Sequence, residues 1–293
     1  MRPDRQRPRT ATRYLALAAF WLACSAAGVS PATGQDADGE PGPGEDSVRQ
    51  EMASDDAPAL TVHEPLYFVV GRGAGEDTKA RFQLSFKYRI LDRKSLLARN
   101  APWLADIHFG YTQTSLWNWD EESAPFEDSS YRPSVFWQTG RLHGPNSGSF
   151  LRIGVEHESN GQAGDESRSL NTAFVQPGLS LDVLDRELLL APTFHAYLDK
   201  GRYNTDIEDY RGYGDLLLRY GNDDSWVVQT RYRYGLGGHH TTQVDLSIPL
   251  RERIFARTGA YLYIQYFNGY GESLLGYDQQ SGPTLRAGIA IVR

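Results

Sequence analysis

Apolar and polar residues alternate along the chain from about residue 66 to its end. Phe82, Leu84 and Phe86, for example, are separated by Gln83 and Ser85. Strict alternation puts successive side chains on opposite faces, which is the period of a β-strand. The pattern predicts about twelve strands of roughly ten residues each. These strands are expected over residues 66–72, 79–91, 104–118, 131–141, 149–159, 169–183, 187–199, 210–220, 225–236, 240–249, 254–267 and 281–293.

The connections between these strands alternate between tight turns and longer loops. Strands of about ten residues can cross a bilayer at a tilt. Short turns at one end and long loops at the other are typical of outer-membrane barrels, whereas a soluble β-sandwich shares only the alternation of residues. The predicted fold class is therefore all-β, a transmembrane antiparallel β-barrel of about 12 strands with both termini in the periplasm. The tight turns are expected at 184–186, 222–223 and 251–252, and the longer loops at 119–130, 160–168, 200–209 and 268–280.

Composition agrees with such a barrel and argues against two other classes. The formal net charge of −7 provides no basic surface, so no nucleic-acid partner is expected. No run of about 18 apolar residues occurs, which argues against a helical membrane protein. The 17 tyrosines and 29 glycines are an ordinary mixture for a barrel with aromatic girdles.

The first part of the chain differs from the rest and is expected to lie outside the barrel. Residues 1–34 have the features of a signal peptide, with a basic start, an apolar core and small residues before a cleavage site. Residues 35–60 form an acidic, Gly- and Pro-rich segment, predicted to be a disordered linker. The barrel domain is expected over 61–293. A basic signal peptide on such a chain indicates the outer membrane of a Gram-negative cell.

Three polar residues with the chemistry of a hydrolase occur where two predicted strands follow one another. His157 and Ser159 end one strand, and Asn171 begins the next. A hydroxyl, a base to deprotonate it and a group to orient that base are the parts of a nucleophilic hydrolase. By strand parity all three share the apolar face, which is the lipid-facing wall of a membrane barrel. Polar residues there are costly. A position at the rim explains His157 alone, but the three together favour a site that acts on lipid.

These residues lie in stretches that resemble the motifs of outer-membrane phospholipase A. The resemblance runs through most of residues 66–293, and the family is a twelve-stranded barrel, in agreement with the strand count. The matching stretches are His157-Glu158-Ser159-Asn160-Gly161; Ser167-Arg168-Ser169 with Asn171; Tyr111-Thr112-Gln113 with Ser115 and Trp117; Glu121-Glu122-Ser123 with Pro125-Phe126; and Gly269-Tyr270-Gly271-Glu272-Ser273-Leu274.

The resemblance implies a calcium-dependent serine hydrolase of phospholipid acyl esters, with phospholipase A1, phospholipase A2 and lysophospholipase activity. Ser159 would be the nucleophile, His157 the general base and acid, and Asn171 the residue that orients His157. Gly161 matches the residue whose amide contributes to the oxyanion hole. The implied substrates are membrane phospholipids and lysophospholipids.

The resemblance also implies Ca²⁺, one ion per active site and two per dimer, and an active homodimer. The positions that match the calcium ligands are the Gln162 backbone carbonyl, the Ser167 hydroxyl and Ser123 from the partner subunit. Gln113 matches a glutamine at the dimer interface. The topology alone supports part of this arrangement, because the loop with Ser123 and the loop at 160–168 are expected at the same, extracellular end of the barrel.

Two other functional classes stay open at the level of sequence. A non-catalytic outer-membrane barrel, a porin or a structural protein, would have a polar lumen and no need for the His-Ser-Asn spacing. A lipid A deacylase would be a smaller barrel with a carboxylate to orient its histidine, and Asn171 argues against it. Lipid extraction after incubation separates the three classes, because the products are fatty acid with lysophospholipid, trimmed lipid A, or unchanged lipid.

Overall fold

The computed structural model describes residues 58–139, 149–250 and 259–293, which all belong to one compact unit, Arg49–Arg293. The predicted signal peptide, residues 1–34, lies outside the described residues, as does the predicted linker up to residue 57, and both stay predictions there. The end of the predicted linker, residues 58–60, is described, and Leu60 already pairs with Tyr88 in the sheet, so the linker boundary was placed too late. None of the described helices is long and apolar enough to cross a membrane.

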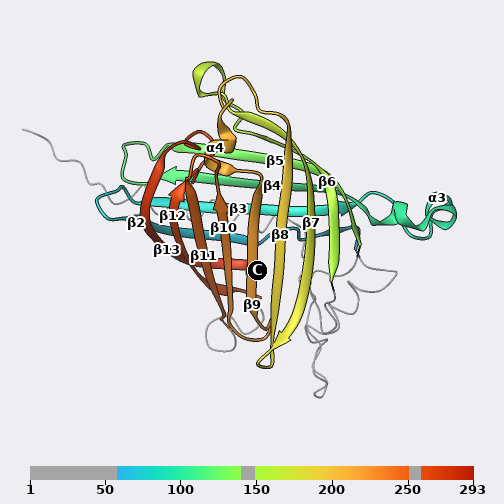
Figure 1. The fold of residues 1–293 in the computed structure, drawn as a ribbon. Coiled ribbons are helices and arrows are strands. Elements are labelled where there is room, and N and C mark those ends of the chain that lie inside the picture. Colours follow the sequence, from blue (N-terminus) through green and yellow to red (C-terminus); the bar gives the residue numbers. More distant parts are fainter. Residues whose placement is uncertain (1–57, 140–148, 251–258) are drawn as a thin grey trace, which may run out of the picture. The chain divides into compact units, whose positions relative to one another are not determined.

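The strands in the described part of the chain form one antiparallel sheet that closes on itself (Figure 1). From β2 onward each strand pairs with the next in sequence, and β13 pairs back with β2. Closure leaves no unpaired edge in the bilayer. The strands are β1 (Leu60–Thr61), β2 (Leu66–Gly73), β3 (Lys79–Arg89), β4 (Ile107–Asn118), β5 (Phe126–Thr139), β6 (Phe150–Ser159), β7 (Ser169–Val183), β8 (Arg186–Asp199), β9 (Gly214–Gly221), β10 (Val227–Tyr234), β11 (His240–Pro249), β12 (Tyr261–Tyr270) and β13 (Gln280–Val292). The helical segments are α3 (Leu96–Asn100), η1 (Pro102–Asp106), η2 (Gly164–Glu166) and α4 (Ile207–Arg211).

The two first strands, β1 and β2, occupy one position in the barrel because both pair with the same edge of β3. Thr61 lies opposite Lys87, and Tyr67 lies opposite Gln83. Between these two paired positions Tyr67 is six residues after Thr61, whereas on β3 Lys87 is only four residues after Gln83. The segment between β1 and β2 therefore has two residues more than β3 and bulges out of the pairing. The barrel therefore has 12 strand positions, which confirms the predicted fold class.

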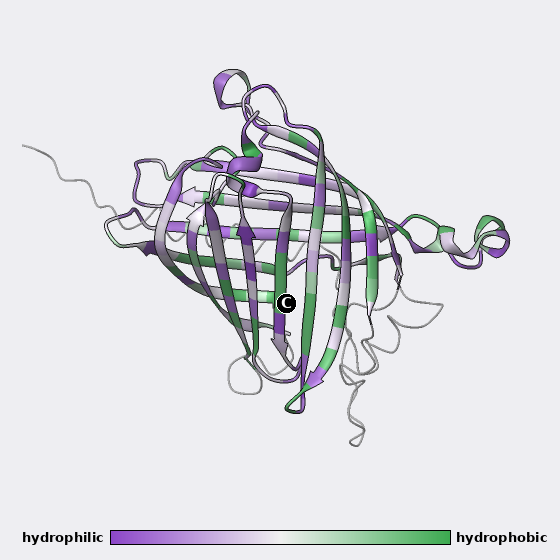
Figure 2. Cartoon of the chain, viewed as in Figure 1, coloured by the Kyte–Doolittle hydropathy of each residue, from purple (hydrophilic) through white to green (hydrophobic). Residues whose placement is uncertain are grey.

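The barrel is polar inside and apolar outside. In β3, Gln83 and Ser85 are buried, whereas Leu84 and Phe86 are exposed. Green and purple segments alternate in the same way along other strands in Figure 2. Even Arg286, on β13, is only 1% exposed because it points into the lumen. An apolar outer surface around a polar interior is the arrangement of a barrel that spans a bilayer.

Most predicted strand boundaries agree with the structure to within a few residues, but residues 210–213 do not begin a strand. The chain forms the short helix α4 (Ile207–Arg211) there. Two acidic residues lie in its first turn and Arg211 in its last, which suits the helix dipole, and Gly212 at φ 63° ends it. The prediction followed the apolar alternation and missed these local helix signals.

The connections agree only in part with the predicted alternation of turns and loops. The tight turn at 184–186 is confirmed, since Leu184 and Asp185 have φ of 51° and 60°, as a type I′ turn requires. The turn at 251–252 lies outside the described residues. Residues 90–106, for which no turn or loop was predicted, depart from the general alternation. They contain α3 and η1 and form a long connection at the end of the barrel that has the tight turns. Loop length in barrels is a tendency, and no hydrogen-bonding rule enforces it.

The loop between β12 and β13 is anchored in the lumen by Glu272. Its Oε1 lies 2.6 Å from Arg286 Nη1 and 3.8 Å from Arg81 Nη1. Ser281 Oγ donates a hydrogen bond of 3.1 Å to Oε2. Burial by itself would raise the pKa of the Glu272 carboxyl, but Arg286 and Arg81 outweigh it and hold the pKa below its ordinary value.

We predict that Glu272→Ala destabilises the barrel by about 3–5 kcal/mol, because it leaves two buried guanidinium groups without their carboxylate. The measurement is urea unfolding in detergent at neutral pH. Since the folded-state pKa of Glu272 is lowered, the difference from wild type should shrink as the pH falls through that pKa. Asp182→Asn, at an exposed carboxylate on β7, is the control, and an equal loss in both variants would contradict the prediction.

Candidate active site on the outer wall

The catalytic residues predicted from the sequence meet where β6 and β7 pair. His157, on β6, lies directly opposite Asn171, on β7. The ring nitrogen Nδ1 of His157 is 2.8 Å from Asn171 Oδ1. Both residues continue the outward face of their strands, since Val155, two residues before His157, is exposed. The predicted pairing of the imidazole with the amide on the lipid-facing wall is therefore present in the geometry.

The hydrogen bond to Asn171 determines which nitrogen of His157 can act as a base. An amide oxygen only accepts hydrogen bonds, so Nδ1 carries the proton and donates it. The other ring nitrogen, Nε2, is then unprotonated and can accept a proton from a hydroxyl. The contact gives Asn171 the geometry that an aspartate has in the Ser-His-Asp triad, without a negative charge.

Ser159 lies two residues beyond His157 on the same face of β6. It faces Tyr131, on β5, on one side and Ser169, on β7, on the other. Within the described residues no hydrogen bond joins the Ser159 hydroxyl to His157. The two side chains are therefore neighbours on one face of β6.

The loop that follows Ser159 is held together by Asn160, whose role the sequence analysis did not identify. Asn160 is 2% exposed. Its Oδ1 accepts from the amides of Gln162 (3.3 Å) and Arg168 (2.9 Å), and its Nδ2 donates to the Glu166 carbonyl (2.8 Å). One side chain thus fixes both ends of the loop. The signal in the sequence was an asparagine directly after a strand, where its amide can replace backbone partners.

Gly161 adopts a φ of 68°, in the left-handed region that favours glycine. A Cβ atom at this position would approach the Tyr131 ring to 3.3 Å. Gly161 is therefore held in a turn directly beside the predicted nucleophile. Its amide follows the predicted nucleophile by two residues, in the segment where a serine hydrolase would have an oxyanion-hole donor.

The loop between β6 and β7 contains two oxygen atoms that suit a hard cation. The Gln162 carbonyl and the Ser167 hydroxyl have no hydrogen bond to other described residues. Asp165 and Glu166 lie between them and make the loop acidic. No cluster of three or more His, Cys, Asp or Glu side chains able to hold a metal occurs in the described ranges. A carbonyl and a hydroxyl do not belong to such a cluster, and they fit calcium, which binds oxygen ligands of all kinds.

Ser123 lies in the loop between β4 and β5, at the same end of the barrel as the β6–β7 loop. Ser123 and Ala124 have φ of 71° and 43°, which is unusual for residues with side chains. Two hydrogen bonds hold this conformation. Trp117 Nε1 donates to the Ala124 carbonyl, and the backbone N–H of Asn118 donates to the Pro125 carbonyl at 3.0 Å. Ser123 is exposed, and β5 separates it from the strand with the catalytic residues.

Gln113 lies in the same row of the outer wall as Ser159, the predicted nucleophile. It is opposite Tyr131, and Tyr131 is opposite Ser159. The side-chain amide of Gln113 forms hydrogen bonds to two neighbours on β4. Its oxygen accepts from the Tyr111 hydroxyl (3.1 Å), and its NH₂ group donates to the Ser115 hydroxyl (3.3 Å). The predicted outward orientation of Gln113 agrees with this geometry.

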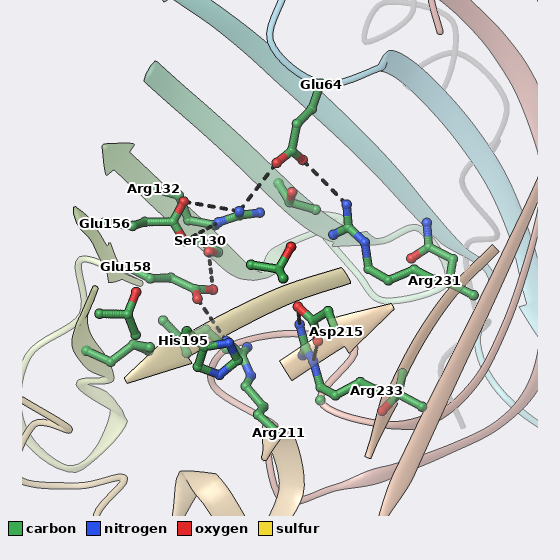
Figure 3. A pocket seen from close by; sticks show the side chains of 18 of the residues that line it. Glu64, Ser130, Arg132, Glu156, Glu158, His195, Arg211, Asp215, Arg231 and Arg233 are labelled. Atoms are coloured by element: carbon green, nitrogen blue, oxygen red, sulfur yellow. Dashed lines mark hydrogen bonds and ion pairs between the residues drawn. The ribbon is translucent and has the colours of Figure 1, made fainter. Parts of the chain in front are cut away.

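Side chains that alternate with the catalytic residues form ion pairs in the lumen. Glu158, between His157 and Ser159, points inward, where its Oε2 is 2.8 Å from Arg211 Nη1 and its Oε1 accepts from the Ser130 hydroxyl at 2.7 Å (Figure 3). Arg211 belongs to α4, so this ion pair fastens the β8–β9 loop to the catalytic strand. The lumen contacts were not predicted, because alternation specifies which face a residue has but not its partner across the barrel.

The fold and the site together define a class, a membrane-spanning β-barrel with a serine-hydrolase constellation on its outer wall. The chain belongs to the phospholipase A1 family, whose model matches residues 50–291. A putative phospholipase A1 of Neisseria meningitidis serogroup B is 33% identical over 218 residues, which are 71% of this chain and 53% of that protein. Phospholipase A1 of Escherichia coli K12 is 28% identical over 205 residues, 68% of this chain and 65% of that protein.

The match to these curated relatives spans between 53% and 65% of their length. Two solved structures are similar in fold. Outer membrane phospholipase A from Escherichia coli has a TM-score of 0.65 at 22% identity, covering 84% of this chain and 96% of the other. The Salmonella typhi outer membrane phospholipase dimer with bound calcium has a TM-score of 0.63 at 21% identity, covering 80% and 92%.

We predict that Asn160→Ala loosens the β6–β7 loop while the barrel stays folded. The variant loses three hydrogen bonds to the loop backbone, each worth about 0.5–1.5 kcal/mol. Trypsin cleavage after Arg168 in detergent should become faster. The control is Asn222→Ala, which removes similar backbone bonds at the opposite end of the barrel. Equal cleavage rates after Arg168 in the two variants would show that Asn160 does not hold the loop.

Proposed function

We propose that the chain is a calcium-dependent hydrolase of phospholipid acyl esters that works in the outer membrane of a Gram-negative cell. Its substrates would be phospholipids and lysophospholipids, cleaved as by phospholipases A1 and A2. The observation that carries the proposal is the 2.8 Å contact between His157 and Asn171 on the outward face of the barrel, with Ser159 beside it. The outward face of a membrane-spanning barrel is in contact with lipid, so a site there suits a lipid substrate.

The reaction follows from the roles that the geometry supports. The Ser159 hydroxyl oxygen attacks the ester carbonyl while His157 Nε2 accepts the hydroxyl proton. The imidazolium, oriented by Asn171, returns this proton to the departing alkoxide, and a lysophospholipid leaves. The fatty acyl group remains on Ser159 until a water molecule, deprotonated by the same ring nitrogen, releases it as free fatty acid. The Gly161 amide would donate to the oxyanion in both halves of the reaction.

Calcium would be held by the Gln162 carbonyl, the Ser167 hydroxyl and Ser123 of the partner subunit, as one ion per active site and two per dimer. When bound, the ion supplies positive charge beside the oxyanion. Asn160 keeps the two ligands of the β6–β7 loop in one conformation. The bound calcium in the Salmonella typhi structure supports this assignment for a barrel of the same fold.

The proposed active form is a homodimer whose two subunits contact each other along the wall that contains Gln113. That wall is flat or convex around Ser159, whereas enzyme sites are usually concave. A second subunit seated on it would cover the acyl chain and exclude water. The exposed loop with Ser123 could then reach the neighbouring site. By barrel topology both termini would lie in the periplasm, after removal of residues 1–34 as a signal peptide.

The lumen distinguishes this proposal from an open porin. The Glu64 and Arg132 side chains, 3.4 Å apart, and the Glu158–Arg211 pair cross the interior (Figure 3). A third pair, Arg233 with Asp215 at 2.6 Å, lies nearby. These pairs line a polar cavity of about 210 Å³ in the barrel interior (Figure 3). Because they link strands and loops across that cavity, they favour a rigid support for the wall over an open passage.

We predict that Ser159→Ala abolishes fatty-acid release from mixed phospholipid–detergent micelles, with a loss of at least about 1,000-fold, because the nucleophile is gone. The measurement is free fatty acid and lysophospholipid produced by refolded protein in calcium. Ser225→Ala, in the turn before β10, is the matched control and should retain wild-type activity. Release that survives Ser159→Ala would refute the assigned nucleophile.

We also predict that Ser167→Ala raises the calcium concentration needed for half-maximal activity by about ten-fold, since one oxygen ligand is lost. Terbium luminescence should show the same weakening without substrate. Chelator should stop wild-type release and leave the barrel folded. Activity that is independent of calcium in the wild type would remove the metal from the proposal while leaving the triad in place.

A further inference from the structure

The strand β8 contains a one-residue β-bulge directly beside the active site. Thr172 lies opposite Tyr197, but the next residue of β7, Asn171, lies opposite Asp199. Leu198 is the extra residue. A bulge places two residues of one strand against one residue of the other and changes the direction of the side chain that follows. Bulges of this kind are enriched next to active sites.

The bulge moves Asp199 from the inside of the barrel to the outside. Thr193, His195 and Tyr197 line the lumen. Uninterrupted alternation would place Asp199 there too, because it is two residues beyond Tyr197. Instead Leu198 and Asp199 are both exposed, and Asp199 shares the outer face with Asn171. The sequence pattern of β8 therefore predicts the wrong face for this carboxylate.

On the outer face Asp199 contacts the residue that orients the catalytic histidine. Asn171 Nδ2 donates to Asp199 Oδ2 at 3.5 Å, while Asn171 Oδ1 accepts from His157 Nδ1 at 2.8 Å. A carboxylate only accepts hydrogen bonds, so it binds the NH₂ side of the amide and opposes a flip. With the amide held in this way, its oxygen must face His157.

We propose that Asp199 is a positioning residue that acts through Asn171. It holds the Asn171 amide in the one orientation that binds the Nδ1 proton of His157, and it adds negative charge two hydrogen bonds away from the imidazolium. A triad with asparagine lacks the charge that aspartate supplies, and Asp199 returns part of it. The inference rests on the proposed hydrolase function, and Asp199 itself touches neither substrate nor Ser159.

The test compares Asp199→Ala, which removes both effects, with Asp199→Asn, which keeps an oxygen to accept from Asn171 Nδ2 but removes the charge. We expect Asp199→Ala to lower kcat about ten-fold with KM unchanged, and Asp199→Asn to recover part of that loss. Detergent melting temperatures should stay at the wild-type value for both variants. Asp182→Asn, at the far end of the same hairpin, is the charge-matched control and should leave kcat unchanged.

A double-mutant cycle separates positioning from a structural role. In an Asn171→Ala background, Asp199→Ala should have no further effect on kcat, because the residue through which it acts is missing. Equal losses in both backgrounds, a rise in KM alone, or a lower melting temperature with no change in kcat would each overturn the proposal.

A second readout keeps this test independent of the natural substrate. The rate at which a lipophilic sulfonyl fluoride modifies Ser159 depends on His157 and its orientation, whichever ester the protein hydrolyses. A wild type that reacts with this probe but releases no fatty acid would refute the phospholipase proposal alone. A wild type that does both, with Asp199→Ala reacting at the wild-type rate, would refute only the role of Asp199.

Discussion

The structure depends on one constraint, that a closed sheet in a bilayer must pair every backbone group and give each side chain one of two environments. Strand β6 shows the consequence most clearly. Glu156 and Glu158 point into the lumen, where Arg132 and Arg211 pair with them, while His157 and Ser159 point outward. The inward residues make the wall rigid, and the outward residues are displayed on it. Support and chemistry are thus separated by one residue along the chain.

The loops at the site end are tied to this wall by contacts that come from distant parts of the sequence. Asn204, in the β8–β9 loop, accepts from the Ser169 amide at 3.3 Å and donates to the Ser169 carbonyl at 3.0 Å. Leu170, next in sequence, packs in a buried cluster with Ile207 of α4 and Leu274 of the β12–β13 loop. The start of β7 is therefore fixed from both sides. Asn171 is the next residue after Leu170. The position of its side chain in the proposed triad therefore depends on loops that contain no residue of that triad.

Alternation in the sequence was sufficient to predict the strands and the faces of His157, Ser159 and Asn171, because both follow from a period of two. The register that puts His157 directly opposite Asn171 depends on the length and shape of the β6–β7 connection. Alternation could not predict features that break that period. These features are the bulge between β1 and β2, the helix α4, whose signals are local, and the shift at Leu198. Asp199 was assigned no role for that reason, since strict alternation would hide it in the lumen. The calcium ligands and the partner contact of Ser123 came from family resemblance and stay proposals.

The proposed hydrolase site lies on the outer wall of the barrel and would be surrounded by phospholipid esters. Some feature must therefore prevent it from hydrolysing the membrane continuously. Gln113, Tyr131 and Ser159 form a row across three strands of the outer wall, β4, β5 and β6, and the row faces away from the barrel. The oxygen ligands in the β6–β7 loop are too few to enclose a calcium ion, which takes six to eight. In the proposed homodimer both deficits would be met by the same event, a second barrel seated against this row with its Ser123 loop. Activity would then be limited by the encounter of two subunits in the membrane, and the chemistry held ready by Asn171 would act only where that encounter occurs.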